Sequence, residues 1–554
     1  MYSSKQNVNI LTSLLVRFGI RQAVVCPGSR NAPITHNLHE CPEINCHSIT
    51  DERSAGFHAL GMCQILNEPV VVCVTSGTAL LNLLPAVAEA YYQHQPLIVV
   101  SADRPLPWIG QMDGQTLPQV QALGEFVKKA ICLPEPHQEE EYWHCNRLIN
   151  EALIAAKRDE SGPVHINVPI AEPLFEWTEA QLPTERKIEF VAPFQWSDNT
   201  KSDDTYIHVL LDALHKATRP LIVIGQMKAG SLSSALISRI ENLNYTVLHE
   251  PLSIDERASC MDEAMALIEN NDYFLPDFIL YLGDALVSKR AKRFLRKARQ
   301  ATCWVVNIDG KLYDTFMNLS GVLQAQPAQV LAHISRKGNE QYFNCWKTVR
   351  QRALACRESF VPNYSQMQAV RLFEEIAVKL SVGSLFHYAN SMAIRLANIY
   401  SKHYVYCNRG VNGIEGTLST AAGCAVVSDQ LTYCIIGDLS FFYDQNALWN
   451  SNLRGNLRIL LLNNGGGGIF HQLPGLEHSA ARDTLITAAH HTTAAGICME
   501  NAITYHAVHD STELPTALEY LTVATSDRPI LVEVFTDMDE DKQNYQAYYQ
   551  SLAL

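Results

Sequence analysis

Short apolar runs that alternate with helix-like segments constrain the fold of this 554-residue chain more than any other feature. Runs such as residues 70–74 and 431–436 are almost wholly apolar and are typical of buried strands. Stretches with the spacing of helices lie between them. Strands that alternate with helices predict parallel, doubly wound sheets, so the chain is expected to be an α/β protein.

The length of the chain predicts about three domains, because a single hydrophobic core rarely extends over more than about 300 residues. We expect an N-terminal domain at 1–183, a central domain at 184–340 and a C-terminal domain at 341–554. Polar, charged stretches at 184–204 and 336–365 are interpreted as the linkers. The expected strands are 22–26, 70–74, 97–100, 164–168, 221–224, 278–282, 303–307, 431–436, 457–462 and 529–535.

Composition excludes several classes of function. The net charge of -14 argues against general binding to nucleic acid or anionic membranes. The first residues show no signal-peptide pattern, and no apolar run approaches the length of a membrane span. The fifteen cysteines are scattered without a Cys-x-x-Cys pair, which is typical of reduced core thiols and predicts a cytoplasmic protein.

Polar side chains end two successive strands in the C-terminal third. Asp438 follows the run at 431–436, and Asn463 and Asn464 follow the run at 457–462, with four glycines next. The carboxyl ends of parallel strands share one edge, where ligands bind. Carboxylate and carboxamide oxygens suit a hard cation such as Mg²⁺, which can bridge to a diphosphate that the glycines let approach. The alternative is a helix-capping Asp and a Gly-rich turn.

Four N-terminal loops stand at strand ends or helix starts: Pro27-Gly28-Ser29-Arg30, Thr50-Asp51-Glu52-Arg53, Thr75-Ser76-Gly77-Thr78 and Ala102-Asp103-Arg104-Pro105. Each has a plain structural alternative, namely a turn with a surface Arg, a helix dipole satisfied by Glu52, a helix N-cap and an Asp-Arg pair.

Two further loops precede the C-terminal Asp-Asn pattern, at 390–395 and 408–416. Ser391 and Arg395 are four residues apart and would share a helix face, although a helix cap with a surface Arg explains them as well. The central domain lacks a G-x-G-x-x-G after its strands, so we expect it to hold no cofactor. Lys289 and Arg290, near a helix start, are kept there as possible substrate contacts.

The Asp438–Asn464 spacing resembles the diphosphate-binding motif of thiamine diphosphate enzymes, with Leu439 in place of the motif's last glycine. Glu52 matches the glutamate with which that superfamily protonates the aminopyrimidine ring of the cofactor. Combined with the loops above, these motifs resemble the 2-succinyl-5-enolpyruvyl-6-hydroxy-3-cyclohexene-1-carboxylate (SEPHCHC) synthases of menaquinone biosynthesis, in the pyruvate-oxidase-like branch.

The resemblance implies three doubly wound domains of the pyruvate-oxidase-like type, with the pyrimidine-binding domain first and the diphosphate- and metal-binding domain last. It implies a transferase that decarboxylates 2-oxoglutarate on thiamine diphosphate and adds the succinyl carbanion equivalent to isochorismate. Both substrates are dicarboxylates, which would explain arginines directed into the cleft of an acidic protein.

The resemblance also assigns residues. Glu52 is the catalytic residue. The cofactor-binding residues are Glu52, Thr75, Gly77, Ser391, Ile414, Gly437, Asp438, Leu439, Ser440, Asn464, Gly466 and Ile469. The ligands of Mg²⁺ (or Mn²⁺) are Asp438, Asn464 and the carbonyl of Gly466, with Asn463 as the competitor of Asn464. The substrate-binding residues are Ser29, Arg30, Arg104, Gln115, Lys289, Ser391, Arg395, Arg409, Phe470 and Leu473. Gly114 stands where the family often has Asn.

In this family the site forms between two subunits, so the resemblance implies a homodimer or homotetramer. Two other functions compete with this interpretation. One is another thiamine diphosphate-dependent 2-oxoacid decarboxylase or a flavin-binding acetohydroxyacid synthase-like enzyme. The other is a non-catalytic metabolite-binding regulator built on the same folds, which would need no Glu at position 52.

Overall fold

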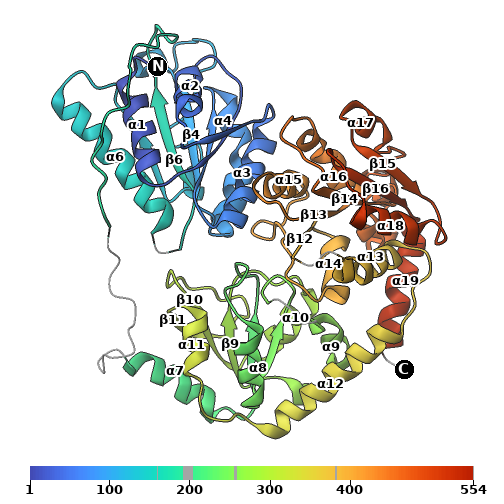
Figure 1. Cartoon of the computed structure of the whole chain (residues 1–554). Helices are drawn as coiled ribbons and strands as arrows, with labels where there is room; N and C mark the ends of the chain where they lie inside the picture. Colours follow the sequence, from blue (N-terminus) through green and yellow to red (C-terminus); the bar gives the residue numbers. More distant parts are fainter. Residues whose placement is uncertain (159, 191–203, 255–258, 381–382, 553–554) are drawn as a thin grey trace.

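The computed structural model describes residues 1–158, 160–190, 204–254, 259–380 and 383–552, and it contains three wholly parallel sheets covered by helices (Figure 1). No helix within these ranges is both long and apolar enough to span a bilayer. Each sheet belongs to one stretch of the chain, so the expected α/β class with three parallel sheets is confirmed.

The first sheet has the order β2-β1-β3-β4-β6-β5. Its strands are β1 (Gln22–Val25), β2 (Asn45–Ser48), β3 (Val70–Val74), β4 (Leu97–Asp103), β5 (Lys129–Cys132) and β6 (Val164–Pro169). Its helices are α1 (Gln6–Arg17), α2 (Ala32–Glu40), α3 (Glu52–Leu66), α4 (Thr78–Asn82), α5 (Leu84–Tyr92) and α6 (Glu139–Lys157). The connections reverse direction between β1 and β3, which is where doubly wound sheets form a ligand crevice.

The second sheet has the order β11-β10-β9-β7-β8. Its strands are β7 (Pro220–Ile224), β8 (Thr246–His249), β9 (Phe278–Leu282), β10 (Thr302–Asn307) and β11 (Leu319–Gln324). The helices around it are α7 (Asp204–Lys216), α8 (Ser234–Asn242), α9 (Met261–Ile268), α10 (Lys289–Lys297) and α11 (Pro327–His333).

The third sheet has the order β12-β13-β14-β16-β15. Its strands are β12 (Leu385–Tyr388), β13 (Thr432–Gly437), β14 (Leu457–Asn463), β15 (Thr504–Val508) and β16 (Ile530–Phe535). Its helices are α13 (Gln366–Leu380), α14 (Met392–Tyr400), α15 (Thr417–Val427), α16 (Asp438–Tyr443), α17 (Ala495–Glu500), α18 (Leu514–Val523) and α19 (Met538–Ser551).

The segment 336–365, expected to be a linker, contains the 20-residue helix α12 (Glu340–Ser359), which runs from the central domain to the C-terminal one (Figure 1). Tyr342 and Trp346 lie four residues apart on one face of this helix and are buried in the core of the central domain. Charged residues on the remaining faces hide this apolar contact in the sequence. Most of the other expected linker, residues 191–203, lies outside the described residues.

The N-terminal and C-terminal domains meet where α3 and α15 lie side by side (Figure 1). A Cβ at Gly61 would stand 2.0 Å from the carbonyl oxygen of Thr420, and one at Gly423 would stand 2.0 Å from that of His58. The two helix backbones therefore touch, and only glycine permits this approach. The contact holds the middle of α3 against the C-terminal domain.

Candidate functional site

The ends of β1 and β3 bring two of the expected N-terminal loops together. A Cβ at Gly28 would lie 2.4 Å from the Cβ of Thr75, so the loops touch. Gly77 has a φ of +87°, its amide donates to Oε1 of Gln119 at 2.6 Å, and the backbone of Gln115 lies directly against it. Thr75, Gly77 and Gln115, three of the predicted binding residues, thus share one edge of the sheet, at its switch point.

Two predicted substrate-binding arginines lie at the same edge. Arg30 is buried and donates from Nη1 to the carbonyl of Ile170 at 2.9 Å. Arg104 donates from Nε to the carbonyl of Gly114 at 2.8 Å. Burial, and then the positive charge of Arg104, lower the pKa of Arg30. Each arginine already has a carboxylate partner, Glu172 at 3.3 Å from Arg30 and Asp113 at 3.0 Å from Arg104, and Ser29 beside them is exposed.

Glu52 is the first residue of α3, as expected. Asp51 caps this helix by accepting hydrogen bonds from the amides of Arg53 and Ser54. Asp51 also accepts a hydrogen bond from Nδ2 of Asn446 at 2.7 Å. The half-buried Glu52 carboxylate makes no hydrogen bond or ion pair of its own within the described ranges.

The helix start is held on the end of α16. Arg53 donates from Nη2 to the carbonyl of Tyr443 at 2.5 Å and lies 4.3 Å above the centre of its ring. Tyr443 is the last residue of α16, and Asp438 is the first. Glu52 and Asp438 are therefore associated with opposite ends of a six-residue helix, roughly 9 Å long at 1.5 Å per residue.

Asp438 and Asn464 follow neighbouring strands, because β13 pairs with β14 in parallel. The buried Asp438 carboxylate accepts hydrogen bonds from the amides of Leu439 (2.6 Å), Asn464 (3.2 Å) and Gly466 (2.9 Å). Burial raises the pKa of Asp438, and the amide of Leu439 and the nearby imidazole of His490 (3.5 Å from Oδ2) oppose that rise. The two halves of the predicted motif are in direct contact.

The hydrogen bonds of the two asparagines distinguish them. Asn463 donates to Glu533 and to the carbonyl of Thr492, and its Oδ1 accepts from Gly465. Asn464 donates from Nδ2 to Oδ2 of Asp541 at 2.9 Å, and its Oδ1 accepts no hydrogen bond within the described residues. The oxygen of Asn464 is therefore available to a ligand, whereas that of Asn463 is used.

The glycine run lets backbone approach backbone beside these oxygens. Gly465 and Gly466 have φ values of +78° and +155°, and a Cβ on Gly466 would lie 2.9 Å from the carbonyl of Thr487. The carbonyl of Gly466 accepts one hydrogen bond, from Gly468 at 3.0 Å, and keeps a second lone pair. A carboxylate, a carboxamide and a carbonyl oxygen around this cradle fit a hard divalent cation and a diphosphate.

The remaining predicted cofactor residues lie around this edge. Gly437 ends β13, Ser440 is buried in α16, and Leu439 is half-buried beside it. Ile469 and Phe470 lie half-buried in the short helix Gly468–Gln472, whereas Leu473 and Ile414 are exposed. No group of three or more His, Cys, Asp or Glu side chains in the described ranges is arranged to hold a metal.

A second cationic region joins the C-terminal and central domains. Arg409 donates from Nη1 to Oδ1 of Asn390 at 3.0 Å, and Lys289 is exposed at the first residue of α10. Burial and the charge of Arg409 lower the pKa of Lys292. Lys292 was not predicted as a site residue, although its position three residues after Lys289 puts both on one helix face. Arg395 donates to the carbonyl of Ser391 at 3.2 Å, which confirms that these two residues are neighbours.

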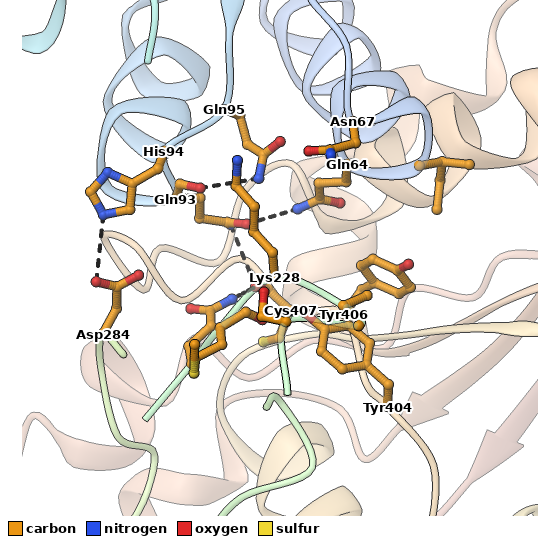
Figure 2. Close-up of a pocket in the computed structure, with 16 residues that line it drawn as sticks. Gln64, Asn67, Gln93, His94, Gln95, Lys228, Asp284, Tyr404, Tyr406 and Cys407 are labelled. Atoms are coloured by element: carbon orange, nitrogen blue, oxygen red, sulfur yellow. Dashed lines mark hydrogen bonds and ion pairs between the residues drawn. The ribbon is translucent and has the colours of Figure 1, made fainter. Parts of the chain in front are cut away.

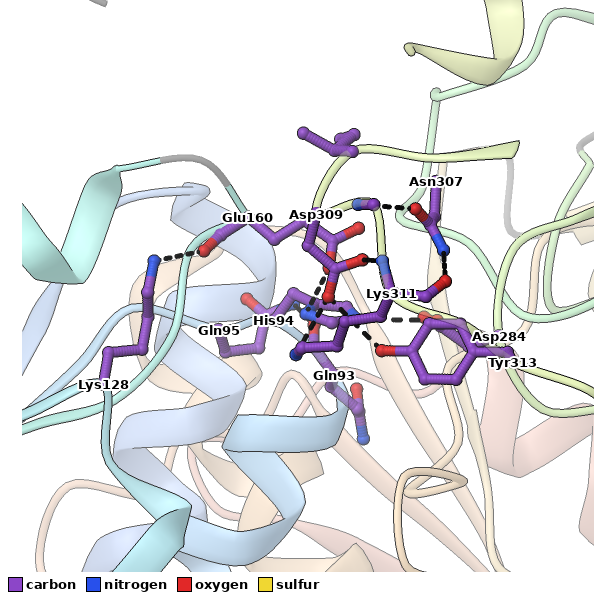
Figure 3. Close-up of polar contacts among 12 residues, drawn as sticks. Gln93, His94, Gln95, Lys128, Glu160, Asp284, Asn307, Asp309, Lys311 and Tyr313 are labelled. Atoms are coloured by element: carbon purple, nitrogen blue, oxygen red, sulfur yellow. Dashed lines mark hydrogen bonds and ion pairs between the residues drawn. The ribbon is translucent and has the colours of Figure 1, made fainter. Parts of the chain in front are cut away.

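An ionic cluster that the sequence did not indicate joins the N-terminal and central domains (Figure 3). His94 lies between Glu160 (Nδ1 to Oε2, 3.1 Å) and Asp284 (Nε2 to Oδ1, 3.5 Å), beside a cavity of about 430 Å³. Burial alone would lower the pKa of His94, but Asp284 and Glu160 raise it. The residues of this ionic cluster are far apart in the sequence, so no local sequence pattern predicts the cluster.

The chain was compared with known proteins. Residues 7–123 match the family model described as "Thiamine pyrophosphate enzyme, N-terminal TPP binding domain". SEPHCHC synthases from Bacteroides fragilis and Bacteroides thetaiotaomicron are each 41% identical to the chain over the full length of both proteins. The SEPHCHC synthase of Flavobacterium johnsoniae is 34% identical over 96% of both chains. On this full-length similarity, the chain belongs to the family of SEPHCHC synthases, which are thiamine diphosphate enzymes.

Proposed function

We propose that this protein is a thiamine diphosphate-dependent transferase of menaquinone biosynthesis. It decarboxylates 2-oxoglutarate and adds the remaining succinyl unit to isochorismate, giving SEPHCHC. The similarity to three SEPHCHC synthases, over 96–100% of each chain, supports the proposal. The structural observation that supports it most is the contact between Asp438 and the Asn464 loop at the edge of neighbouring strands.

In this proposal three oxygens of this chain would hold Mg²⁺ or Mn²⁺ beside the diphosphate of the cofactor. They are the carboxylate of Asp438, Oδ1 of Asn464 and the carbonyl of Gly466. Thiamine diphosphate, when bound, supplies the carbanion chemistry. Glu52 acts as the acid that holds a proton at the aminopyrimidine nitrogen, and its carboxylate has no competing partner in the described residues.

The two cationic regions suit two dicarboxylate substrates. Arg30 and Arg104 form one region, and Arg409 with Lys289 forms the other. Guanidinium groups bind carboxylates through paired hydrogen bonds, so each region can orient one end of a substrate. We assign Gln115 and Ser29 to the first region and Ser391 and Arg395 to the second. We assign the half-buried Phe470 and the exposed Leu473 as apolar contacts of the substrate.

The position of Glu52 supports a homodimer as the smallest active unit. Within one chain no hydrogen bond or ion pair of the described residues joins Glu52 to Asp438 or Asn464, and the two sites lie at opposite ends of α16. A second copy that presents its own Glu52 to the first copy's metal motif completes the site, in a homodimer or a homotetramer. The fifteen cysteines, all within described ranges, are free thiols, in keeping with action in the cytoplasm.

The test is 2-oxoglutarate consumption with thiamine diphosphate and Mg²⁺, with and without isochorismate. Consumption that depends on isochorismate and releases carbon dioxide is expected. Consumption without isochorismate, or turnover of pyruvate only, would replace the proposal by another 2-oxoacid decarboxylase. A purified protein with a bound flavin would point to an acetohydroxyacid synthase-like enzyme.

A further inference from the structure

We propose that Glu89, in the N-terminal domain, is a positioning residue for Arg409, in the C-terminal domain. It fixes the loop 408–413 so that the Arg409 guanidinium meets a substrate carboxylate. This inference rests on the proposed function for the identity of that substrate. Glu89 lies on the last turns of α5 and belongs to no motif of the sequence.

The Glu89 carboxylate binds the loop through consecutive backbone amides. Its Oε1 accepts from the amide of Gly410 and its Oε2 from the amide of Val411, both at 2.7 Å. Gln93 donates from Nε2 to Oε1 at 2.5 Å. Successive amides that converge on one anion form a strong anion-binding site, and here the anion is a side chain of another domain.

The loop is pressed against the helix at this point. Glu89 is only 3% exposed, and a Cβ on Gly410 would lie 2.9 Å from the Cβ of Tyr92. Burial raises the pKa of Glu89, and the hydrogen bonds from Gln93 and the two amides oppose the rise. A carboxylate buried to this degree is tolerated because all its donors are in place. Loss of one donor or of the charge therefore disturbs the whole contact.

The other side of the loop is held by its own domain and by the central domain. Asn390 donates from Nδ2 to the carbonyls of Asn408 and Gly413, both at 2.7 Å. Gln226 donates to the carbonyl of Cys407 at 3.0 Å, and Gln93 donates to the same oxygen at 3.5 Å (Figure 2). All three domains thus converge on the residues just before Arg409.

Arg409 keeps three of its five N–H donors without a partner among the described residues. Its Nη1 donates to Asn390, and its Nη2 reaches the carbonyl of Leu286 at 3.5 Å. Its Nε is buried and has no hydrogen-bond partner among the described residues. The second N–H groups on Nη1 and Nη2 of the half-buried Arg409 can pair with a substrate carboxylate. The direction of these donors depends on the loop, and hence on Glu89.

The test uses Glu89→Gln in the full-length holoenzyme. Glutamine has the same shape, but its amide nitrogen faces a backbone N–H, so one of the two loop hydrogen bonds is lost. We expect the KM for 2-oxoglutarate to rise about tenfold or more, from the loss of a charge-assisted hydrogen bond, with thiamine diphosphate affinity within about twofold. Glu89→Asp, which keeps the charge but draws it back by one bond, should give a smaller rise.

A double-mutant cycle separates positioning from general stability. In an Arg409→Ala background, Glu89→Gln should add little to the KM, because the residue it positions is gone. The matched control is Asn452→Ala, which removes another bond between the same two domains, from Nδ2 to the carbonyl of Ser48 at 2.9 Å, and should leave the KM unchanged. If the increases in KM caused by Glu89→Gln and by Arg409→Ala multiply in the double variant, the proposal is overturned.

Hydrogen exchange of the loop gives a readout that needs no substrate. The amides of Gly410 and Val411 should be protected in the wild-type protein and exchange faster in Glu89→Gln, whereas Asn452→Ala leaves them protected. Unchanged exchange in Glu89→Gln would refute the ordering role. Should the wild-type protein not consume 2-oxoglutarate, the proposed function fails, while the exchange measurement still decides whether Glu89 orders the loop.

Discussion

The orientation of the Asn464 amide depends on Asp541, and replacing this residue by asparagine should weaken metal binding. Asp541 lies on α19 and is buried. Its Oδ2 accepts from Nδ2 of Asn464 and from Oγ1 of Thr536, both at 2.9 Å, and its Oδ1 accepts from the amide of Gln366 at 2.8 Å. The carboxylate therefore holds the Asn464 nitrogen and turns the Asn464 oxygen the other way, toward the cation that we propose.

The size of the effect follows from the hydrogen bonds. Asp541→Asn keeps the shape and the oxygen that Gln366 needs, but its NH₂ faces the NH₂ of Asn464. Either this donor pair stays unsatisfied or the Asn464 amide turns over and presents its NH₂ to the cation. A hydrogen bond to a charged group contributes about 1.5–3 kcal/mol. We therefore expect roughly a 10- to 100-fold loss of metal affinity, the range typical of residues that orient metal ligands.

The assay is a calorimetric titration of Mg²⁺ into the protein with thiamine diphosphate present. Asn544→Ala is the matched control, since Asn544 lies on the same helix and binds the amide of Asn363 at 2.8 Å without reaching the metal motif. The control should lose stability and keep its Mg²⁺ affinity. Equal affinities of Asp541→Asn and the wild-type protein would refute the reasoning, and so would equal losses in both variants.

Four further outcomes are expected. Glu52→Gln should lower turnover about 10²- to 10⁴-fold while cofactor binding persists; unchanged turnover would contradict the acid role. Asp438→Ala should abolish metal-dependent thiamine diphosphate binding, and calorimetry showing intact binding would sink the metal assignment. Burial raises the pKa of Glu263 from the usual 4.5 to about 7, so its stabilising contribution is present in full below pH 4.5 and is lost as the pH rises through 7. The side chain in Glu263→Gln does not titrate. The free energy of unfolding of this variant minus that of the wild-type protein, measured in urea, should therefore be up to about 3 kcal/mol larger at pH 8 than at pH 5. An equal difference at both pH values would contradict this. Gly423→Ala places a Cβ 2.0 Å from a carbonyl oxygen of α3 and should cost at least about 1–3 kcal/mol, so an unchanged melting temperature would show that the helices can separate freely.

The strands that the sequence predicts and those it misses differ in position. Each predicted strand is interior to its sheet, and the six missed strands, β2, β5, β8, β11, β12 and β15, are the two edges of each sheet. Interior strands are covered on both faces and become continuous apolar runs. Most of the edge strands are covered less completely; β2, for example, is fully buried at none of its four residues. An apolar run in the sequence therefore indicates that a segment is buried. It identifies a strand only where that strand is buried.

The departure at Leu439 has a structural reason. The motif of the superfamily has glycine there, yet α16 begins at Asp438 and includes Leu439 in its first turn. A helical backbone needs no glycine, and leucine favours a helix. The amide of Leu439 still donates to Asp438 at 2.6 Å, as any residue but proline would. The substitution thus preserves the contact on which the motif depends.

Local sequence predicts contacts between neighbouring strand ends but not the residues that orient them. Asp438 and Asn464 meet because consecutive strands pair in parallel, which spacing alone can anticipate. The choice between Asn463 and Asn464 depends instead on Glu533 and Asp541, about 70 residues further along the chain. Long-range partners of this kind leave no periodic pattern.

The arrangement around α16 sets the positions of Glu52 and the metal motif within one chain. Arg53 and Asp51 bind the last residues of α16 and the segment after it, so α3 of the same chain is committed to that end. The metal motif lies at the first residue of α16, about 9 Å of helix away from the end that α3 holds. In the dimer that we propose, a second copy supplies the Glu52 that faces this metal motif. The contacts of Asp51 and Arg53, together with the α3–α15 packing, fix where each chain presents its Glu52.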